Sequence, residues 1–528
     1  MKILGEPFIP PAWKTRRCFG LFLVLIATLN WMPLSAAPSP ARPPKPNILL
    51  VMADQLAPFQ TGPYGNREVK TPHLDRLARE GITFTAAYSS SPLCVPARAA
   101  LMSGRYVSRI GVYDNASVLH SEIPTFAHHL RAAGYETALS GKMHFVGADQ
   151  LHGFERRLTA DIYPADFAWT PQWEGGNTLN PRGTPKARMA LEARVAANPS
   201  QMQYDDNAQQ KALAFLRDRP SGASASQRPF LLCVSFSDPH GPYVVPQELW
   251  DLYEGVPITL PEVPADMAPH QSTMDQWVNK FNGLGLVDMR DRKALYRLRR
   301  TYYGQVSYVD RKLGELLDCL KARNELTNTV VLFTSDHGDM LAERLMVEKR
   351  TFYEWGARVP LIAWSPSRWK GGRTSPEPVS LIDIFPTLSE IAGAAAPIEI
   401  DGRSFLNLLE GRPDTGAPRV AISEYHGEGV LAPCFMIREG DFKYVHVTGA
   451  EDQLFNLRDD PGEWKNLAGD GQHRDVETRL RGRLLHEFDP QAIHRAVLLS
   501  QQRRLLMKEA MNSGQRTRWD YQPEETNP

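Results

Sequence analysis

Four nearly continuous apolar runs mark this chain, at 47–54, 229–238, 329–336 and 359–364. Each is built mainly from Leu, Val, Ile, Phe and Ala, with few polar residues in between. Strands that are apolar on both faces are typical of a sheet that helices cover on either side. We therefore predict that all four runs are strands buried at the centre of the protein.

Helical patterns lie between these runs. Segment 124–133 places Phe126, Leu130 and Ala133 on one face, and segment 298–321 carries apolar side chains at the same spacing. Strands that alternate with helices predict an α/β fold with a large, mostly parallel sheet flanked by helices.

The pattern changes near residue 418. Short segments of alternating apolar and polar residues follow, among them 420–424 and 442–447, and such alternation is typical of antiparallel strands. We predict a main domain over 47–417 and a smaller α+β subdomain with an antiparallel sheet over 418–528. The last dozen residues are polar, and we expect them to be frayed.

Residues 174–206 are rich in Gly, Asn and Pro. This composition favours an irregular surface segment over a core element, and we expect a lid or a substrate-binding loop there.

The beginning of the chain has the pattern of a secretory signal. Lys14, Arg16 and Arg17 precede an apolar stretch at 19–29, and small residues at 35–37 suit cleavage. The apolar stretch is short for a membrane span. The paired arginines also fit a twin-arginine signal, which would export a folded protein.

We therefore predict a signal peptide over 1–37 and a stiff, Pro-rich linker over 38–46. The protein is expected to be exported, to the periplasm or the extracellular space, with no stable membrane anchor. An uncleaved anchor is the alternative.

Composition narrows the possible partners. The 528 residues include 60 Lys and Arg against 60 Asp and Glu, so no basic surface field argues for nucleic acid. Five cysteines become four after signal cleavage, and they lie too far apart to indicate a disulfide framework.

Three of the predicted strands end in acidic residues. Asp54 and Asp336 close two of them, with His337 next in sequence, and Asp238 closes a third just before His240. The carboxyl ends of parallel strands share one edge of the sheet, where open α/β folds build their sites. A single such Asp could instead cap a helix.

Oxygen ligands without a set of thiolates suit Ca²⁺, Mg²⁺ or Mn²⁺ better than Zn²⁺. Asp54 and Asp336 therefore predict a divalent cation site, to which His337 could add a nitrogen ligand.

Basic residues near these strands could bind an anion. Lys142 and His144 are two positions apart, so an extended backbone would place both on one face. A fixed cation beside a titratable imidazole could hold an anionic ester and move its proton. His240 lies on a Pro- and Gly-rich turn. Lys349, taken by itself, is interpreted as a surface lysine.

The most specific motif is Cys94-Val-Pro-Ala-Arg98. By itself it could be an ordinary helix start, with Pro96 in the first turn, where a missing N–H is tolerated. The order and spacing of the other motifs decide between the two interpretations. They lie at 47–55, 71–78, 141–144, 239–242, 334–341 and 455–463.

With these motifs, the chain resembles type I sulfatases of the alkaline phosphatase superfamily over about 46–466. Segments 141–154, 161–173, 427–433 and 518–523 are similar to those of choline sulfatases. The resemblance implies an alkaline-phosphatase-like fold, with a large mixed, mostly parallel sheet, and a sulfuric ester hydrolase.

The resemblance also implies a mechanism. Cys94 becomes formylglycine, made by a formylglycine-generating or an anaerobic maturation enzyme, and its hydrate attacks sulfur to give a sulfo-enzyme intermediate. His144 then takes a proton from the remaining hydroxyl, and sulfate is eliminated. The other implied roles are orientation of the nucleophile by Arg98, contact with sulfate oxygens by Lys142, Lys349 and Asn115, and assistance to the leaving oxygen by His240.

The implied metal ligands are Asp54, Asp336, His337 and the modified Cys94, which would hold one divalent ion, with Ca²⁺ favoured over Mg²⁺ or Mn²⁺. Many arylsulfatases carry a second acid where this chain has Gln55. That difference fits the branch that contains choline sulfatases and phosphonate hydrolases.

Choline-O-sulfate is the favoured small-molecule substrate. A quaternary ammonium requires an aromatic face and a nearby carboxylate, for which Trp169 and Glu428 are the candidates. Two features of choline sulfatases are missing from the sequence: a pocket histidine between His152 and His240, and a long acidic tail that reaches a neighbouring subunit. The sequence therefore leaves open whether the protein forms a homo-oligomer. The alternatives are a phosphonate monoester or phosphodiester hydrolase and an inert, ligand-binding descendant.

Overall fold

A computed structural model of the chain describes residues 45–176, 180, 183–220, 228–414, 416–515 and 518–523. The expected signal peptide over 1–37 and all but the end of the linker over 38–46 lie outside the described residues. Among the residues that are described, no helix combines the length and the apolar character needed to cross a membrane.

An eight-stranded sheet dominates the described part of the chain, in the order β11-β2-β10-β9-β1-β7-β4-β5. At its centre β1 (Asn47–Ala53) pairs in parallel with both β7 (Phe230–Ser235) and β9 (Thr329–Ser335), and β4 (Glu136–Gly141) pairs in parallel with β7. The mostly parallel sheet is as predicted.

One predicted strand runs in the opposite direction. β10 (Leu361–Trp364) is antiparallel to β9 and to β2 (Ile82–Phe84), which makes the sheet mixed. An apolar run reports burial on both faces and not strand direction, so the sequence pattern could not distinguish β10 from its parallel neighbours.

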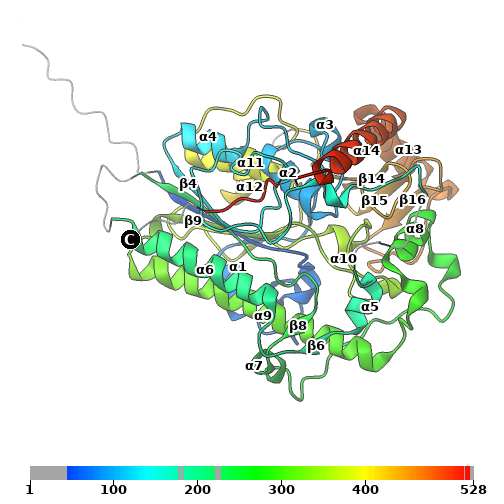
Figure 1. Ribbon diagram of the computed structural model, residues 1–528, viewed down its shortest axis with the longest axis horizontal. Helices are drawn as coiled ribbons and strands as arrows, with labels where there is room; N and C mark the ends of the chain where they lie inside the picture. Colours follow the sequence, from blue (N-terminus) through cyan, green and yellow to red (C-terminus); the bar gives the residue numbers. More distant parts are fainter. Residues whose placement is uncertain are drawn as a thin grey trace, which may run out of the picture. The chain divides into compact units, whose positions relative to one another are not determined.

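The side chains on the two faces of β1 pack into two separate hydrophobic clusters. Leu49 and Val51 belong to a cluster with residues of α1 (Pro72–Glu80), α6 (Ser200–Asp218) and α9 (Arg292–Ala322). Ile48, Leu50 and Met52 belong to a second cluster with residues of α2 (Cys94–Ser103), α4 (Phe126–Ala132) and α11 (Ile384–Ala392). Successive strand residues point to opposite faces, so the apolar run is buried on both sides. Figure 1 shows α6 and α9 on one side of the sheet and α4 and α11 on the other.

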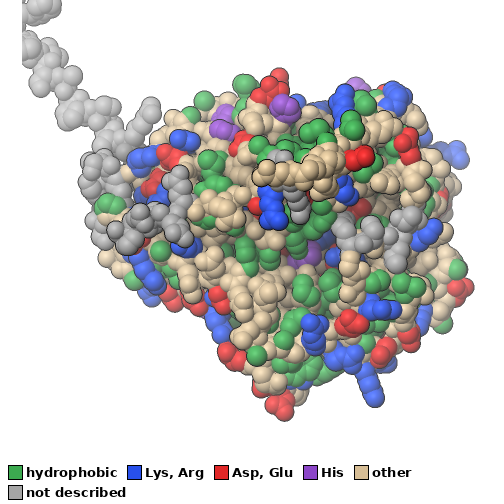
Figure 2. Space-filling view, in the orientation of Figure 1, with side chains coloured by type: hydrophobic (Ala, Val, Ile, Leu, Met, Phe, Trp, Pro, Cys, Tyr) green, Lys and Arg blue, Asp and Glu red, His purple; other side chains and the backbone are tan. Residues whose placement is uncertain are grey.

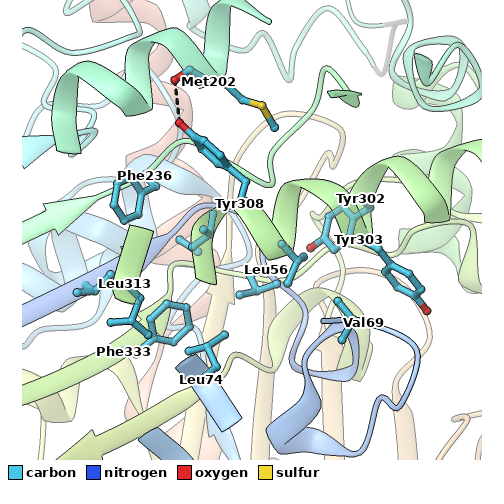
Figure 3. Packing of buried hydrophobic residues seen from close by; sticks show 14 of the residues in the cluster. Leu56, Val69, Leu74, Met202, Phe236, Tyr302, Tyr303, Tyr308, Leu313 and Phe333 are labelled. Carbon is cyan, nitrogen blue, oxygen red and sulfur yellow. Dashed lines mark hydrogen bonds between the residues drawn. The ribbon is translucent and has the colours of Figure 1, made fainter. Parts of the chain in front are cut away.

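The long helix α9 packs its tyrosines into the first of these clusters (Figure 3). Tyr308 donates a hydrogen bond to the carbonyl oxygen of Met202 in α6 at 2.9 Å, which satisfies a buried hydroxyl and joins two helices. Tyr302 likewise donates to the carbonyl oxygen of Gln55 at 2.6 Å, directly after β1.

The expectation of an irregular segment over 174–206 is wrong at its end. α6 begins at Ser200, and Gln201, Met202 and Asp205 in its first turns are buried. Short elements also interrupt the segment earlier, at α5 (Lys186–Leu191) and β6 (Arg194–Val195). The polar residues of these turns hide the helical periodicity because several of them are buried.

A second, antiparallel sheet has the order β13-β14-β15-β16 within the described residues, which confirms the predicted antiparallel sheet. Its strands are β13 (Ala421–Tyr425), β14 (Cys434–Glu439), β15 (Phe442–Val447) and β16 (Gln453–Asn456). The domain boundary at 417–418 stays a prediction.

Two helices follow this sheet, α13 (Arg474–Glu487) and α14 (Pro490–Asn512). Residues beyond them were expected to be frayed, but Trp519 packs edge-on against Phe167 at 5.3 Å between ring centroids. That expectation is wrong for the described residues 518–523.

The remaining elements are short. They are α3 (Val107–Ile110), α7 (Gln247–Asp251), α8 (Thr273–Asn282), α10 (Glu354–Ala357), α12 (Leu406–Leu409), β3 (Ala87–Tyr88), β5 (Arg156–Arg157), β8 (Val244–Val245), β11 (Arg373–Ser375), β12 (Val379–Ser380) and the single-turn 3₁₀ helix η3 (Phe167–Trp169).

Candidate active site

The candidate site lies at the carboxyl ends of the central strands. Asp54 follows β1, Asp336 and His337 follow β9, and Lys142 follows β4. Gly141, the last residue of β4, has φ +93°, and a side chain there would collide with the carbonyl oxygen of Ser235 in β7. Glycine therefore allows β4 to approach β7 directly before Lys142.

Cys94 is the first residue of α2, with Pro96 in the first turn. The interpretation as a helix start and the interpretation as a reactive motif are therefore both compatible with the geometry. The side chain of Leu93 does not cap this helix. In the first turn, however, the backbone N–H of Val95 donates to Asn115 Oδ1 at 3.0 Å. Asn115 thus fixes the backbone beside Cys94.

Four potential metal ligands converge here. Asp54, Cys94, Asp336 and His337 are all buried, and their ligand atoms lie within 4.8 Å of one another. Cys94 Sγ lies 3.3 Å from His337 Nε2 and 3.9 Å from Asp54 Oδ1. Two carboxylates, one imidazole and the Cys94 side chain form a donor set that fits a hard divalent cation.

Two buried cations support these carboxylates. Arg98 donates to Asp336 Oδ2 at 2.8 Å and to Asp54 Oδ2 at 3.2 Å, and Lys142 forms an ion pair with Asp54. Burial and the Cys94 thiol raise the pKa of Asp54, but Lys142, His240 and Arg98 outweigh them and lower it to about 2. Asp54 is therefore ionised and available as a ligand.

Cys94 faces two ammonium groups. Lys142 Nζ lies 3.6 Å and Lys349 Nζ 3.5 Å from Cys94 Sγ. Burial raises the pKa of the thiol, but Lys142, Lys349 and His337 outweigh that effect and hold the pKa well below its usual value. The surroundings of Cys94 therefore favour a negative charge, which is what a bound sulfate ester would bring.

His144 lies beside Cys94 under aromatic rings. Its ring is 4.8 Å from that of Tyr163 and 5.5 Å from that of Trp169, between centroids. Burial lowers the pKa of His144, which favours the neutral imidazole that a general base requires. The backbone N–H of His144 donates to Asp161 Oδ2 at 2.7 Å, which holds the residue in its left-handed conformation, with φ 59°.

One cavity of about 260 Å³ joins most of the predicted residues. Figure 2 shows a histidine inside a hollow near the centre of this face, between hydrophobic side chains. Arg98, Asp54, Asp336 and Lys142 are not among the residues that line this cavity, but Lys142 Nζ lies 3.6 Å from Cys94 Sγ. The predicted residues that line the cavity are Cys94, Asn115, His144, Trp169, His240, Lys349 and Glu428.

The cavity also has lining residues that were not predicted as site residues, among them Tyr163, Lys186, Glu348 and Arg350. Glu348 lies 3.3 Å from Lys186 Nζ and 2.9 Å from Arg350 Nη1, and Arg350 Nη2 lies 3.4 Å from Glu428 Oε1. Only their place in the sequence could have indicated some of these residues. Glu348 and Arg350 flank Lys349, and Tyr163 lies in the segment around Trp169.

Asp238 does not join the cluster. Its Oδ1 accepts from Gln305 Nε2 at 2.8 Å, and its backbone N–H donates to Asp205 Oδ2 at 2.9 Å. Burial and the neighbouring Asp205 raise its pKa well above the usual range. Asp238 therefore supports the turn that carries His240 and is not one of the four potential metal ligands.

Comparison with known proteins agrees with this geometry. The family model described as "Sulfatase" matches residues 46–394, and that described as "N-sulphoglucosamine sulphohydrolase, C-terminal" matches 342–489. A third, "Choline sulfatase enzyme C terminal", matches 495–527. The third match includes segment 518–523, for which a similarity to choline sulfatases was predicted.

Individual relatives support the same assignment. The chain is 42% identical to a choline-sulfatase of Rhizobium meliloti (strain 1021), over 91% of this chain and 94% of the relative. It is 28% identical to an arylsulfatase of Clostridium perfringens, over 84% of this chain and 95% of the relative. A crystal structure of the phosphonate monoester hydrolase of Agrobacterium radiobacter superposes with a TM-score of 0.68 at 25% identity, covering 85% of this chain and 96% of that one. The chain belongs to the sulfatase family and is a sulfuric ester hydrolase.

Proposed function

We propose that this protein is an exported sulfatase that hydrolyses a small alkyl sulfate ester, choline-O-sulfate above all, to the alcohol and inorganic sulfate. One observation carries the proposal: the cavity that Cys94 lines is bordered both by cations, such as Lys349, and by an aromatic ring and a carboxylate, Trp169 and Glu428. The 42% identity to a choline-sulfatase supports the same substrate.

The lining of the cavity suits both halves of choline-O-sulfate. Lys142 and Lys349 surround Cys94, where the sulfate would bind. Trp169 and Glu428 line the same cavity, and a quaternary ammonium binds best over an aromatic face with a carboxylate nearby. The cavity has a volume of about 260 Å³. A cavity of this size favours the ester of a small alcohol over a sulfated polymer, which would not fit inside it.

We propose that Cys94 is converted to formylglycine by a maturation enzyme and that the hydrated aldehyde supplies the nucleophile for attack on sulfur. In the structure described above, the thiol stands in for that hydrate. After the attack, His144 would take the proton of the remaining hydroxyl, so that the C–O bond to sulfate breaks, sulfate leaves and the aldehyde forms again. Burial favours the neutral imidazole that this step requires. His240 lines the same cavity and would assist the departing alcohol oxygen.

The four-residue cluster would hold one divalent ion, with Asp54 and Asp336 as oxygen ligands, His337 as a nitrogen ligand and modified Cys94 as the fourth. Ca²⁺ fits this carboxylate-rich set best, although Mg²⁺ and Mn²⁺ use similar ligands. When bound, such an ion would stabilise negative charge on the sulfate oxygens and on the hydrate. Arg98 keeps both carboxylates in place.

A phosphonate monoester or phosphodiester hydrolase is the second candidate. The likeness to the phosphonate monoester hydrolase of Agrobacterium radiobacter favours it, at 25% identity and a TM-score of 0.68. Sulfate and phosphonate monoesters share a tetrahedral centre with charged oxygens, so the cations around Cys94 could serve either substrate.

Substrate turnover separates these candidates. The protein should be produced with and without a formylglycine-generating enzyme, and the peptide that contains Cys94 examined by mass spectrometry. We expect kcat/KM for choline-O-sulfate to exceed that for an aryl sulfate and for a phosphonate monoester, and only in the modified protein. If choline-O-sulfate were the poorest of the three, or if unmodified protein were fully active, the proposal would be wrong.

Export has its own test. N-terminal sequencing of the protein recovered from its host should begin near residue 38 if the signal is removed after the small residues at 35–37. A mature protein that still begins at Met1 would contradict a cleaved signal.

A further inference from the structure

The wall of the cavity that would face the alcohol is a loop with little regular structure. We call residues 161–173 the aromatic loop; its only helical element is the single turn η3. Tyr163 and Trp169 pack against each other at 5.0 Å between ring centroids, and Tyr163 lies beneath Lys142 Nζ at 4.4 Å from its centroid. The positions of these rings therefore depend on what holds the loop.

The beginning of the aromatic loop is fixed by the body of the protein. Asp161 Oδ2 accepts from Arg157 Nη2 at 2.9 Å, and the backbone N–H of Gly147 donates to the carbonyl oxygen of Ala165 at 2.8 Å. The contacts change from Ala165 onward.

Three backbone groups of the loop are paired with side chains from the end of the chain. The N–H of Ala165 donates to Asp520 Oδ1 at 3.0 Å, and the N–H of Trp173 donates to Gln501 Oε1 at 2.9 Å. Lys508 Nζ donates to the carbonyl oxygen of Ala168 at 3.1 Å, next to Trp169.

Rings add to these hydrogen bonds. Trp519 packs edge-on against Phe167 at 5.3 Å, and His494 lies 5.5 Å from Trp173, between centroids. Phe167 and Trp169 are the two ends of η3. Contacts with the end of the chain therefore reach both sides of the residue that would bind the ammonium.

The end of the chain is itself anchored. Arg504 in α14 donates to both carboxylate oxygens of Asp114, at 2.5 and 2.7 Å, and Asp114 precedes Asn115, which holds the start of α2. Tyr521 lies 5.1 Å from the guanidinium of Arg157. In Figure 1 the red trace leaves α14 and runs back toward β4.

We propose that α14 and residues 518–521 act as a brace that positions the aromatic loop, so that Trp169 and Tyr163 are preorganised for the alcohol half of the substrate. The proposal rests on the proposed alkyl sulfatase activity. Trp519, Asp520 and Gln501 are positioning residues, because they act through the loop and do not line the cavity. Preorganisation lowers the ordering cost of binding, so its loss should weaken the binding of the alcohol.

Trp519→Ala and Asp520→Ala, each in full-length protein with modified Cys94, test the brace. One aromatic pair and one hydrogen bond are each worth about 1 kcal/mol, so each variant should raise KM for choline-O-sulfate by roughly five- to tenfold. KM for methyl sulfate, which lacks a bulky alcohol, and kcat for both esters should stay within about twofold. Leu506→Ala is the control, because Leu506 lies on α14 with 68% of its surface exposed.

Two further measurements separate positioning from general destabilisation. In a Trp169→Ala background, Trp519→Ala should have no additional effect on KM, since the contact acts through Trp169. Hydrogen exchange at the Ala165 amide should accelerate in Asp520→Ala, while exchange in β1 and β9 stays unchanged.

Unchanged KM for choline-O-sulfate in both variants, an equal loss with both esters, or additive effects of Trp519→Ala and Trp169→Ala would each overturn the brace. If wild-type protein does not prefer choline-O-sulfate over methyl sulfate, the proposed substrate is wrong. The exchange measurement still tests the brace in that case: unchanged exchange at Ala165 in Asp520→Ala would refute it.

Discussion

Arg98 donates from Nε to Asp336 Oδ2 at 2.8 Å, and both side chains are buried. Its Nη2 also reaches Asp54 Oδ2 at 3.2 Å, so one planar guanidinium joins the two carboxylates beside Cys94. The donors of a guanidinium have fixed directions, whereas an ammonium is a single point charge. Arg98 therefore sets the geometry of the carboxylates as well as balancing their charge.

Arg98→Lys should lower both metal affinity and kcat by about 10- to 100-fold, the usual effect of losing a partner that orients metal ligands. Metal content by elemental analysis and kcat with choline-O-sulfate provide the measurement. Arg98 is also part of the pentapeptide that resembles the modification motif, so mass spectrometry must first establish that Cys94 is modified in the variant.

The matched control for this prediction is Arg105→Lys, because Arg105 pairs with Glu399 at the surface, away from the cluster. Wild-type metal content and kcat in fully modified Arg98→Lys protein would show that a point charge is sufficient.

The buried cluster of Asp54, Cys94, Asp336 and His337 should couple metal binding to stability. A ligand that binds only the folded state stabilises it, by about 3 kcal/mol at a concentration 100-fold above its dissociation constant. We therefore expect a chelator to lower the melting temperature and added Ca²⁺ to restore it. Calorimetry with Asp54→Asn provides the control, since its melting temperature should respond much less to Ca²⁺. The same response in both proteins would place the ion elsewhere.

Glu428 should recognise positive charge on the alcohol. Its carboxylate lines the cavity, and its Oε1 lies 3.4 Å from both Arg350 Nη2 and Asn115 Nδ2. Glu428→Gln keeps the shape and removes the charge, so KM for choline-O-sulfate should rise by roughly tenfold, equivalent to about 1.4 kcal/mol.

The neutral isostere 3,3-dimethylbutyl sulfate tests the cause of that rise, because carbon replaces nitrogen in the same shape. Its KM should be the same in wild type and in Glu428→Gln. An equal change with both esters would mean that Glu428 acts on the shape of the cavity through Arg350 and Asn115.

The part of the candidate site around Cys94 could be predicted because its residues follow buried strands or belong to short motifs. Asp54 and Asp336 each end an apolar run, and parallel strands bring such ends to one edge. Lys142 and Cys94 were found through local spacing. No comparable pattern identifies Lys186 or Tyr163, whose place in the cavity depends on how long irregular segments fold back.

An α+β subdomain was predicted at the end of the chain, but the position of its helix α14 was not, for a different reason. The buried residues of α14 are Val497, Gln501 and Arg504, so two of its three inward positions are polar. Gln501 and Arg504 are buried because they bind the Trp173 backbone and Asp114. A hydrophobic pattern cannot reveal a helix whose inward face is used for hydrogen bonds.

Asp310 in α9 makes the pH dependence of stability testable away from the active site. It accepts from the backbone N–H groups of His73 and Leu74 at 3.1 and 2.7 Å, in the first turn of α1, where Thr71 makes no side-chain cap. Burial raises the pKa of Asp310 to about 7; the two N–H groups oppose the rise, and nearby Asp75 adds to it. The Asp310 carboxyl group therefore takes the place of a side-chain cap at the start of α1, which requires that an acidic group be buried.

The sign of the effect follows from the two pKa values. An unfolded Asp has a pKa of about 3.9, so between pH 4 and 7 the folded state binds more protons, and stability falls as the pH rises. Asp310→Asn removes this titration. From pH 4.5 to 8, the free energy of unfolding of wild type relative to Asp310→Asn should fall by at most about 4 kcal/mol. Urea unfolding at several pH values provides the measurement, with exposed Asp318→Asn on the same helix as the control. A difference that rises with pH would mean that the two N–H groups outweigh burial, so that Asp310 is a charged cap of α1.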